Sequence, residues 1–579
     1  MLDAGGQYCH LIARKVRELG VYAEVQPSDT PVCRLAGRKA LIISGGPSSV
    51  YELGSPTVDP EIFRTGAGVL GICYGHQLMV HLLGGVVERG EQGEYGVATL
   101  EVHTPGELFA DTEPRQQIWM SHRDLVTAPP PSFSVLAGTS TCPIAAMGDA
   151  ERRLYGVQFH PEVIHTPRGK DLLANFLFRV CGCARDWNPS HQIPHLEEEI
   201  RAAAGDRNVF FFVSGGVDST VAYLLCLRAL GPGRVRGVYV DTGLMREGET
   251  ETVEQMFASL AAGTVTVEHA RDRFLRALEG VVEPERKRQI IGAEFLRVQE
   301  RAAETWHLLD GHWVLGQGTI YPDTIESGGT KQAATIKTHH NRVEGVRRLI
   351  EEGRLVEPLH SFYKDEVREI GKLLGVSPDW LDRHPFPGPG LAIRCLCSEA
   401  DLPFSRRQEG WVMPVHSVGV QGDSRSYAPV LALDRPADAE AKAAATNLIN
   451  RLSGFNRVVA LAASHAPLAA MRVHASAMCE IRLERLRQAD AAVRRISRAS
   501  GFDTRIWQFP VVLIPAGTDD RPDSVVLRPV DSVDGMTAES VLMPESLLRT
   551  VAEALLALPG VSAVFFDLTN KPPATIEWE

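Results

Sequence analysis

A glycine-rich loop between an apolar run and a helical stretch is the feature that most constrains the fold of this chain. Residues 208–213 are apolar enough for a buried strand, the loop is Ser214-Gly215-Gly216-Val217-Asp218-Ser219, and residues 220–230 have helical composition. A second apolar run at 236–240 follows. Strand, loop, helix and strand in this order predict a parallel sheet with ligand sites at the carboxyl ends of its strands.

The same loop is suited to bind phosphate groups. Its backbone N–H groups and hydroxyls would lie at a helix N-terminus, where the helix dipole favours anions. No Lys-Ser/Thr pair follows, as it would in a Walker A loop, so transfer of a γ-phosphate is disfavoured. Asp241, at the end of the next strand, is placed to meet an adenosine hydroxyl. The alternative interpretation is a glycine-rich turn whose Asp or Ser only caps the helix.

The length of 579 residues points to three to five domains, at roughly 100–200 residues each. We predict an α/β multidomain chain with an α/β domain at 1–185, a parallel-sheet domain at 196–394 and an α+β domain at 395–579. The third domain contains an internal repeat, with halves at about 395–468 and 469–579, because segments 454–467 and 560–573 share length and pattern. Chance similarity between two strand-turn segments is the alternative.

Charge and composition exclude several classes of protein. The net charge of −12 has the wrong sign for a protein that coats nucleic acid or an anionic membrane, although a local basic pocket for one phosphate remains open. The longest dense apolar run, 209–213, is far shorter than a membrane-spanning helix. The ten cysteines form no C-x-x-C pair, and Met1-Leu2-Asp3 lacks signal-peptide character. We therefore expect a cytoplasmic protein without nucleic-acid or membrane partners.

A cysteine occupies a sharp turn in the first domain. Gly71-Ile72-Cys73-Tyr74-Gly75 follows an apolar run and precedes a helical stretch at 77–83, a pattern typical of a nucleophile elbow with sulfur in place of oxygen. Downstream, His160 and Glu162 lie two residues apart, and in an extended segment Glu162 would orient His160 as the base for the thiol. Turn 44–47 would hold an oxyanion with its backbone N–H groups. Each piece alone is typical of core or surface residues, but their combination indicates a catalytic site.

These motifs resemble the class I glutamine amidotransferase domain over residues 1–185. The matching segments are Ser44-Gly-Gly-Pro47, Gly71-Ile-Cys-Tyr-Gly-His-Gln77 and Gln158-Phe-His-Pro-Glu162. The resemblance implies hydrolysis of glutamine through a thioester, with a catalytic triad of Cys73, His160 and Glu162. It also implies that the amides of Gly46 and Tyr74 form the oxyanion hole. The implied glutamine contacts are Gln77, His122 and Asp124. Domains of this family usually begin with a full strand, whereas only two residues precede Asp3 here, so we expect an incomplete first strand.

The glycine-rich loop resembles the PP-loop of N-type ATP pyrophosphatases, which split ATP between the α- and β-phosphates. Further segments extend the resemblance over the whole chain to the glutamine-hydrolysing GMP synthase family; they are Lys287-Arg-Gln-Ile-Ile-Gly292, residues 316–323, Ile336-Lys-Thr-His-His-Asn341, residues 384–394 and residues 571–579. The resemblance implies amination of xanthosine 5′-monophosphate (XMP, xanthylate) through an adenylyl intermediate. Glutamine, ATP and XMP would be the ligands, and Mg²⁺ would accompany ATP.

The family resemblance also implies positions for the nucleotides. The XMP-binding positions are Arg288, Asp423, Gln508, Lys571 and Glu577; the ATP or pyrophosphate positions are Ser214, Gly215, Gly216, Val217, Asp218, Ser219, Asp241 and Lys337. Arg and Lys side chains can neutralise a phosphate, and carboxylates can accept from N–H or hydroxyl donors. Lys337 lies in a polar stretch with His339, His340 and Asn341 that would form a lid over the phosphates. The metal ligands and the roles of the two histidines are left open.

Other functions remain as alternatives. Another PP-loop glutamine amidotransferase, such as an NAD synthetase-like enzyme, would keep both motifs but would not be expected to end in Lys-Pro-Pro-x-Thr-x-Glu-Trp-Glu. A PP-loop RNA-thiolating enzyme fits neither the charge nor the cysteine pattern, and a catalytically silent scaffold would not need a complete triad. Short-tailed family members pair as dimers through a single C-terminal unit, whereas the repeat would make that pairing within one chain. We expect a viable monomer, with a homodimer as the alternative.

Overall fold

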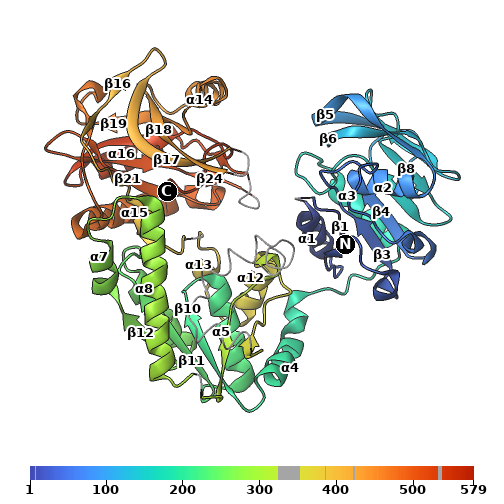
Figure 1. Ribbon diagram of the computed structural model, residues 1–579, viewed down its shortest axis with the longest axis horizontal. Coiled ribbons are helices and arrows are strands. Elements are labelled where there is room, and N and C mark those ends of the chain that lie inside the picture. The colour runs from blue at the N-terminus through green and yellow to red at the C-terminus, as the bar shows by residue number, and fades with distance from the viewer. Residues whose placement is uncertain are drawn as a thin grey trace. The chain divides into compact units, whose positions relative to one another are not determined.

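The computed structural model describes the chain except residues 7, 262, 309, 324–351, 385, 422–423, 453 and 533–536, together with the side chains of 91–92, 420–421, 424–425 and 450. Internal contacts divide it into two compact units, Met1–Pro189 and Ser190–Glu579 (Figure 1). The predicted second and third domains both lie in the second unit, and the division between them near residue 394 stays a prediction. Each unit is described by itself.

The first unit is built on one nine-stranded sheet. Its strands, in spatial order, are β2 (Gln26–Pro27), β1 (Leu2–Asp3), β3 (Ala40–Ile43), β4 (Gly68–Ile72), β9 (Leu154–Val157), β8 (Ala146–Asp149), β7 (Ser134–Gly138), β5 (Val86–Val102) and β6 (Arg115–Ala128). The strands from β2 to β9 run parallel, and those from β9 to β6 pair antiparallel. The parallel half therefore has a common carboxyl edge, at which β3 and β4 both end.

Apolar residues alternate between the two faces of this sheet. Ile42 and Leu70 pack with helices α1 (Cys9–Glu18) and α3 (Gly169–Ala174), whereas Ile43 and Val69 pack with α2 (Tyr74–Leu82). Side chains of a strand point alternately to opposite faces, so the continuous apolar runs of β3 and β4 cover both. The sheet is thus buried between helices, with α2 starting directly after β4.

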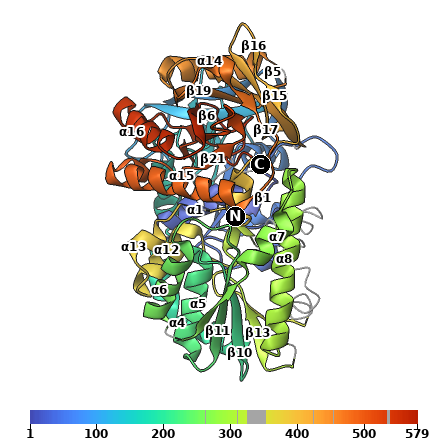
Figure 2. The same ribbon diagram turned by 90° about the vertical axis from the view of Figure 1, so that its left-hand side faces the viewer.

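The second unit begins with a five-stranded parallel sheet. Its order is β12 (Val265–His269), β11 (Val235–Asp241), β10 (Asn208–Val213), β13 (Trp313–Gly316) and β14 (Leu355–Val356). Figures 1 and 2 show helices α4 (Ile193–Ala204) and α5 (Val217–Leu230) on one side and α8 (Pro284–Thr305) on the other. Phe211 of β10 meets Tyr223 of α5 at 5.4 Å between ring centroids, whereas Phe210 packs with α8 residues such as Ile291. The described residues of this part also form helices α6 (Glu249–Leu260), α7 (Arg271–Leu278), α12 (Lys364–Leu373) and α13 (Pro378–Leu381).

A seven-stranded sheet forms the C-terminal part of this unit. Its order is β16 (Ser405–Arg406), β17 (Trp411–Gln421), β18 (Ser424–Leu433), β19 (Arg457–Ser464), β26 (Val561–Asp567), β23 (Asp523–Leu527) and β21 (Val511–Ile514). Helices α14 (Ala439–Arg451), α15 (Glu480–Ala499) and α16 (Glu545–Leu556) cover one face, and Trp578 packs on the other. Two-residue strands form two further small sheets: β15 (Leu402–Pro403), β20 (Arg472–Val473) and β22 (Ala516–Gly517), and β24 (Val530–Asp531) with β25 (Glu539–Ser540).

The two halves of this sheet have the same design. In the first half β18 runs parallel to β19 with α14 between them in sequence, and in the second half β23 runs parallel to β26 with α16 between them. The halves meet where β19 and β26 pair antiparallel. The matched segments 454–467 and 560–573 contain these two central strands, so the geometry is consistent with an internal repeat, to which the second half adds α15.

Two predicted boundaries shift by several residues. Helix α2 begins at Tyr74 rather than at residue 77, and α5 begins at Val217, inside the predicted loop 214–219. Asp218 lies in the first turn of α5, where an acidic residue complements the helix dipole, so the helix extends closer to the strand than the glycines suggest. The loop proper is therefore Ser214 to Gly216. None of the helices in the described ranges has the length and apolarity needed to cross a membrane.

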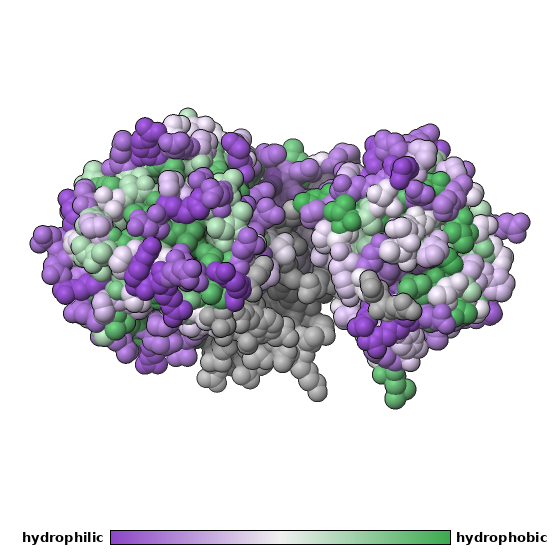
Figure 3. Space-filling view, turned by 90° about the horizontal axis from the view of Figure 1, so that it is seen from above, coloured by the Kyte–Doolittle hydropathy of each residue, from purple (hydrophilic) through white to green (hydrophobic). Residues whose placement is uncertain are grey.

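The visible surface is mixed in character. Figure 3 shows hydrophilic residues over both units, interrupted by small apolar areas. The large hydrophobic side chains with high exposure include Leu53, Tyr95 and Ile164 in the first unit and Ile481 in the second.

Candidate active site

Cys73 occupies a strained turn between β4 and α2. Its backbone φ is +52°, a value that residues with a Cβ rarely adopt, and the side chain is 6% exposed. A Cβ added to Gly71 would lie 2.4 Å from the carbonyl oxygen of Gly75, and one on Gly75 would lie 2.3 Å from that of Ile43. Only glycine fits at both positions, which explains the Gly-x-Cys-x-Gly spacing of the predicted elbow.

His160 and Glu162 are in contact. His160 Nδ1 lies 2.7 Å from Glu162 Oε1, and both side chains are buried. Burial opposes protonation of His160, but the charge of Glu162 and hydrogen bonds to Cys73 and Glu162 outweigh it and raise the pKa of His160 to about 10. The predicted extended geometry is wrong, because β9 ends at Val157 and the pair lies in a turn. That turn is held by Thr166, whose hydroxyl donates to the His160 carbonyl at 2.7 Å.

The turn after β3 lies beside the thiol. A Cβ on Gly45 would lie 3.6 Å from Cys73 Cβ and 3.3 Å from His160 Cε1, and one on Gly46 would lie 3.4 Å from the ring of Tyr74. The Gly75 amide donates to the Ser44 carbonyl at 3.1 Å, which ties this turn to the elbow. Gly45, the residue before the proposed oxyanion-hole residue Gly46, therefore lies beside Cys73 and His160.

A cavity of about 950 Å³ opens onto Cys73 and His160 and is also lined by Gln77, His122 and Asp124. Gln77 donates its amide to the Asp124 carbonyl at 2.8 Å, and His122 Nδ1 lies 2.9 Å from the same oxygen. The Asp124 carboxylate accepts hydrogen bonds from Ser49 at 2.5 Å and Tyr51 at 3.0 Å. These two hydroxyls were not predicted from the sequence. The only sequence feature that points to them is their position just after the turn 44–47.

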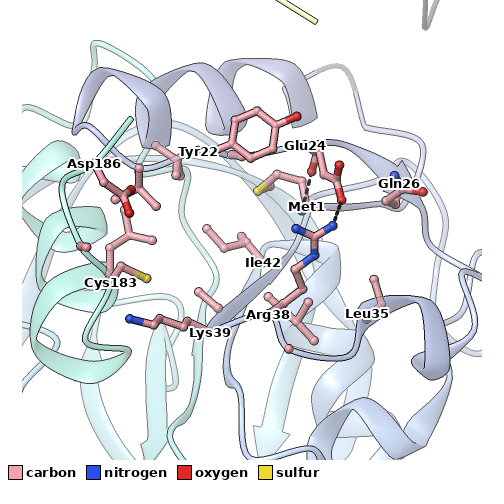
Figure 4. A pocket seen from close by; sticks show the side chains of 18 residues that line it. Met1, Tyr22, Glu24, Gln26, Leu35, Arg38, Lys39, Ile42, Cys183 and Asp186 are labelled. Carbon is pink, nitrogen blue, oxygen red and sulfur yellow. Dashed lines mark hydrogen bonds and ion pairs between the residues drawn. The ribbon is translucent and has the colours of Figure 1, made fainter. Parts of the chain in front are cut away.

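A smaller cavity of about 290 Å³ lies elsewhere in the first unit (Figure 4). It is lined by Met1, Ala40 and Ile42 and by the Arg38–Glu24 ion pair. Ala40 begins β3, so this cavity lies toward the amino end of the strand, whereas Cys73 follows the carboxyl end of β4. None of the catalytic positions predicted from the sequence borders it.

In the second unit, the glycine-rich loop closes on itself. Ser214 Oγ lies 2.9 Å from Ser219 Oγ and accepts from the Gly216 amide at 3.2 Å. Gly215 has a φ of +73°, and a Cβ on Gly318 would lie 2.7 Å from Ser219 Cα, so both positions need glycine. The loop thus presents backbone and hydroxyl groups at the N-terminus of α5.

Two carboxylates lie at this edge of the parallel sheet. Asp241 ends β11 and accepts from the Gly243 amide at 2.9 Å. Asp218 forms an ion pair with Lys364 Nζ at 2.6 Å, while its other oxygen, Oδ1, is buried and has no hydrogen-bond partner among the described groups. Lys364 was missed because nothing near it in the sequence marks a phosphate site. In the described part of the chain, no group of three or more His, Cys, Asp or Glu side chains is placed to hold a metal ion.

The predicted XMP positions fall into two neighbouring groups. The first group lies at the small β24–β25 sheet. Gln508 pairs its backbone with Val530 of β24 at 2.9 and 3.1 Å, and Lys571 pairs its backbone with Ala538, the residue before β25, at 2.7 and 3.2 Å. The other group lies at the C-terminal segment, where Arg288 donates to the Glu579 carbonyl.

The Glu577 carboxylate is paired with a cation. Arg394, which is 1% exposed, donates to its carboxylate through Nε at 2.9 Å and Nη2 at 2.6 Å. Lys287 is fully buried and bonds the Glu579 carboxylate at 2.8 and 2.9 Å. Both cations belong to the motifs used for the resemblance, but no role was assigned to them from the sequence. Together they hold the C-terminal segment against the rest of the unit.

Five of the residues singled out in the sequence lie outside the described residues. They are Asp423 among the XMP positions and Lys337, His339, His340 and Asn341 in the predicted lid. Their roles remain predictions.

Comparison with known proteins supports both resemblances. The family described as glutamine amidotransferase class-I matches residues 1–180, and the GMP synthase C terminal domain matches residues 495–578. A probable glutamine-hydrolysing GMP synthase of Leptospira interrogans is 43% identical, covering 100% of this chain and 99% of that protein. The GMP synthases of Caldicellulosiruptor saccharolyticus and Thermobifida fusca are each 40% identical, with 100% of this chain covered and 99% and 97% of theirs. The family predicted from the sequence is confirmed. The chain belongs to the glutamine-hydrolysing GMP synthases, which are amidotransferase ligases that carry out glutamine-dependent GMP synthesis.

Proposed function

We propose that this chain hydrolyses glutamine at Cys73 and uses the ammonia to aminate XMP, with ATP split into AMP and pyrophosphate at the loop after β10. The observation that carries the proposal is the buried His160–Glu162 contact beside the strained Cys73, on a chain that also bears a phosphate-binding loop. One site supplies a nucleophile for an amide, and the other supplies the donors that a pyrophosphate needs.

The glutaminase half follows from the groups around the thiol. His160 holds the proton that the thiol gives up, and the Cys73 thiolate attacks the carboxamide carbon of glutamine. The amides of Gly46 and Tyr74 stabilise the oxyanion that forms. His160 then returns the proton to the leaving nitrogen, so that ammonia departs and a thioester remains for water to hydrolyse. Glu162 holds the imidazole in place and stabilises its protonated form.

The nucleotide half uses the loop residues 214–219 for the pyrophosphate of ATP and Asp241 for the adenosine. Asp218 has one buried oxygen without a hydrogen-bond partner among the described groups, next to the loop that would hold the phosphates. This fits Mg²⁺, a cation that commonly takes one or two carboxylates plus phosphate oxygens. When bound with ATP, Mg²⁺ would neutralise charge on the phosphates. Lys364 would move from Asp218 toward the phosphates when the nucleotide enters.

For XMP, we assign the phosphate to Arg288 and Lys571 and the base and ribose to Gln508, Glu577 and Asp423. Arg394 would fix the Glu577 carboxylate through its two hydrogen bonds. We further propose that the chain acts as a monomer in the cytoplasm. The β19–β26 pairing joins the two halves within one chain, and the cysteine pattern suits a reducing compartment. Light scattering that showed an obligate dimer at low micromolar concentration would contradict the monomer.

A substrate comparison tests the proposed reaction. The purified chain is given ATP, Mg²⁺ and glutamine with either XMP or deamido-NAD, and AMP and pyrophosphate are measured. We expect AMP and pyrophosphate in equal amounts with XMP only. Release with deamido-NAD instead would favour an NAD synthetase-like enzyme, and release with neither would favour a silent homologue.

A further inference from the structure

Cys397 lies in a cluster of charged groups that the proposed reaction does not use. It follows Arg394 by three residues and is half-buried. Its Sγ lies 3.6 Å from Arg482 Nη1 and 3.5 Å from the Cys395 carbonyl oxygen. The same carbonyl accepts from Lys287 Nζ at 2.9 Å, so an ammonium and a guanidinium both approach the thiol.

The charges around this thiol do not balance while it is protonated. Arg482 and Arg485 share the buried carboxylate of Asp523, and Lys287 bonds the carboxylate of Glu579. Arg288 also lies against the Glu579 backbone oxygen. Burial raises the pKa of the Glu579 carboxyl to about 7, so this group compensates only part of the positive charge at neutral pH. Because uncompensated charge in a buried cluster is costly, a thiolate at Cys397 would supply further compensation.

The neighbouring thiol provides a further contribution. Its hydrogen bond with Cys397, together with burial, raises the pKa of Cys395 well above its ordinary value, so Cys395 keeps its proton and can donate it to a thiolate. The hydrogen bond from Cys395, with the charges of Lys287 and Arg482, outweighs burial and lowers the pKa of Cys397 to about 6. Cys397 is thus a thiolate at neutral pH and becomes protonated as the pH falls below 6.

We propose that Cys397 is a modification site that reacts with small uncharged electrophiles, hydrogen peroxide among them, and that its modification weakens the Lys287–Glu579 hold on the C-terminal segment. The thiolate attacks one peroxide oxygen, an S–O bond forms and the O–O bond breaks. Sulfur is oxidised to a sulfenic acid, peroxide is reduced, and the second oxygen leaves as hydroxide, which the buffer protonates to water.

The expected consequence rests on the proposed function. A sulfenic acid or alkyl group adds volume beside Lys287, which would displace the ammonium from the Cys395 carbonyl and the Glu579 carboxylate. Glu579 lies two residues from Glu577 and accepts a hydrogen bond from Arg288 through its carbonyl. Loosening this segment would therefore raise the KM for XMP and leave the glutaminase reaction at Cys73 unchanged.

Alkylation of the full chain tests the first part. The Cys73→Ala chain is treated with iodoacetamide between pH 5 and 9, and peptides are quantified by mass spectrometry. Cys479 and Cys33, both exposed, serve as internal controls. We expect half-maximal labelling of Cys397 near pH 6, and at pH 6.5 a rate roughly tenfold above that of Cys479. Labelling of Cys397 that rises in parallel with Cys479, or no labelling of Cys397, would overturn the proposal.

Two arginines on α15 provide a matched pair of variants. Arg482→Gln removes the guanidinium next to the thiol and is expected to move the labelling midpoint upward by about one pH unit. Arg498→Gln removes an exposed arginine of the same helix and should leave the midpoint unchanged. Equal midpoints in both variants would contradict the assigned environment. The pH profile of the Cys73→Ala chain itself decides the question if Arg482→Gln does not fold.

Ammonium-dependent synthesis tests the second part. The KM for XMP is measured for the Cys73→Ala chain and for Cys73→Ala/Cys397→Ser, before and after iodoacetamide or peroxide treatment. We expect a rise of roughly fivefold only where Cys397 is present. An equal KM in treated and untreated chains would overturn the coupling. Absence of XMP-dependent AMP from the untreated chain would count against the proposed function, and the alkylation profile would still decide the reactivity of Cys397.

Discussion

The two candidate sites of this chain are assembled in different ways. At Cys73, the histidine and carboxylate partners are two residues apart and already in contact at 2.7 Å. At the nucleotide site, the charged residues are held by partners that are far away in sequence: Lys364 and Asp218 are 146 residues apart, Arg394 and Glu577 are 183 apart, and Lys287 and Glu579 are 292 apart.

This difference distinguishes a preformed site from one that exchanges partners. The His160–Glu162 pair needs no rearrangement to act, because its contact is one that the reaction uses. The nucleotide site keeps Asp218, Glu577 and Glu579 paired with cations, which reduces unpaired charge before a ligand enters. Ligands would then replace or extend these ion pairs. Variants of the two sites should therefore fail in different steps.

The largest expected effect separates the two sites completely. Cys73→Ala should lower glutamine-dependent GMP formation by roughly a thousandfold or more, because no other nucleophile replaces the thiol. Synthesis from high ammonium at alkaline pH should persist, since the nucleotide site is unchanged. Both rates are measured on the same preparation. Loss of both activities would refute the division of labour.

Within the triad, Glu162→Gln should lower glutaminase turnover by roughly a hundredfold, because His160 loses its charged partner. The pKa of His160 is raised from 6.5 to about 10, so the contact stabilises the fold fully below pH 6.5 and loses this contribution as the pH rises through 10. The difference in thermal unfolding between the parent chain and Glu162→Gln should therefore shrink between pH 6.5 and 10. A difference that grows over this range would contradict the assigned ion pair.

At the nucleotide site, Arg394→Met should raise the KM for XMP by roughly ten- to a hundredfold, because it leaves the half-buried Glu577 without its cation. Glutaminase turnover in the absence of nucleotides should not change. Arg394→Met/Glu577→Gln is the matched control, because it removes the unpaired charge and should recover stability but not XMP affinity. An unchanged KM in Arg394→Met would show that this ion pair does not position Glu577.

Coupling between the sites is expected to be about tenfold, within the usual range for linked sites. Ammonia released without an acceptor would be lost to protonation and diffusion, so glutaminase turnover should be slow until XMP and ATP occupy the second site. Turnover is measured with neither ligand, with each alone and with both. Equal rates under all four conditions would show that the two sites act independently.

The smallest effect concerns the hydroxyls that hold Asp124. Tyr51→Phe removes one hydrogen bond and should raise the KM for glutamine by only a few-fold, with kcat unchanged. Ser49→Ala should act in the same direction. A large drop in kcat from either variant would place these hydroxyls in the chemistry rather than in binding.

The local geometry of the first site could be predicted from the sequence because its signals are local. The strand, the elbow and the helix are consecutive, and Gly71 and Gly75 are required by backbone contacts that follow from that turn. The His160–Glu162 pairing was also anticipated, but for the wrong backbone conformation, since spacing alone does not distinguish a strand from a turn. Ser49 and Tyr51 could not be found, because their partner Asp124 reaches them only through the fold.

The second site was predicted by resemblance more than by local pattern. The glycine-rich loop and the order of β10, α5 and β11 follow from hydrophobic runs, whereas the start of α5 was placed too late. The partners of Asp218, Glu577 and Glu579 come from distant helices and loops, and no spacing rule links them. Long-range ion pairs depend on tertiary packing, so they had to be read from the structure.

The most direct test of the central claim follows one nitrogen atom through both sites. The chain is given glutamine labelled with ¹⁵N in its side-chain amide, together with unlabelled ammonium, XMP, ATP and Mg²⁺, and the GMP formed is analysed by mass spectrometry. The account predicts GMP that carries ¹⁵N, formed in equal amount to AMP, with the label lost in Cys73→Ala. Unlabelled GMP from the parent chain, or labelled glutamine hydrolysis without any GMP, would contradict it.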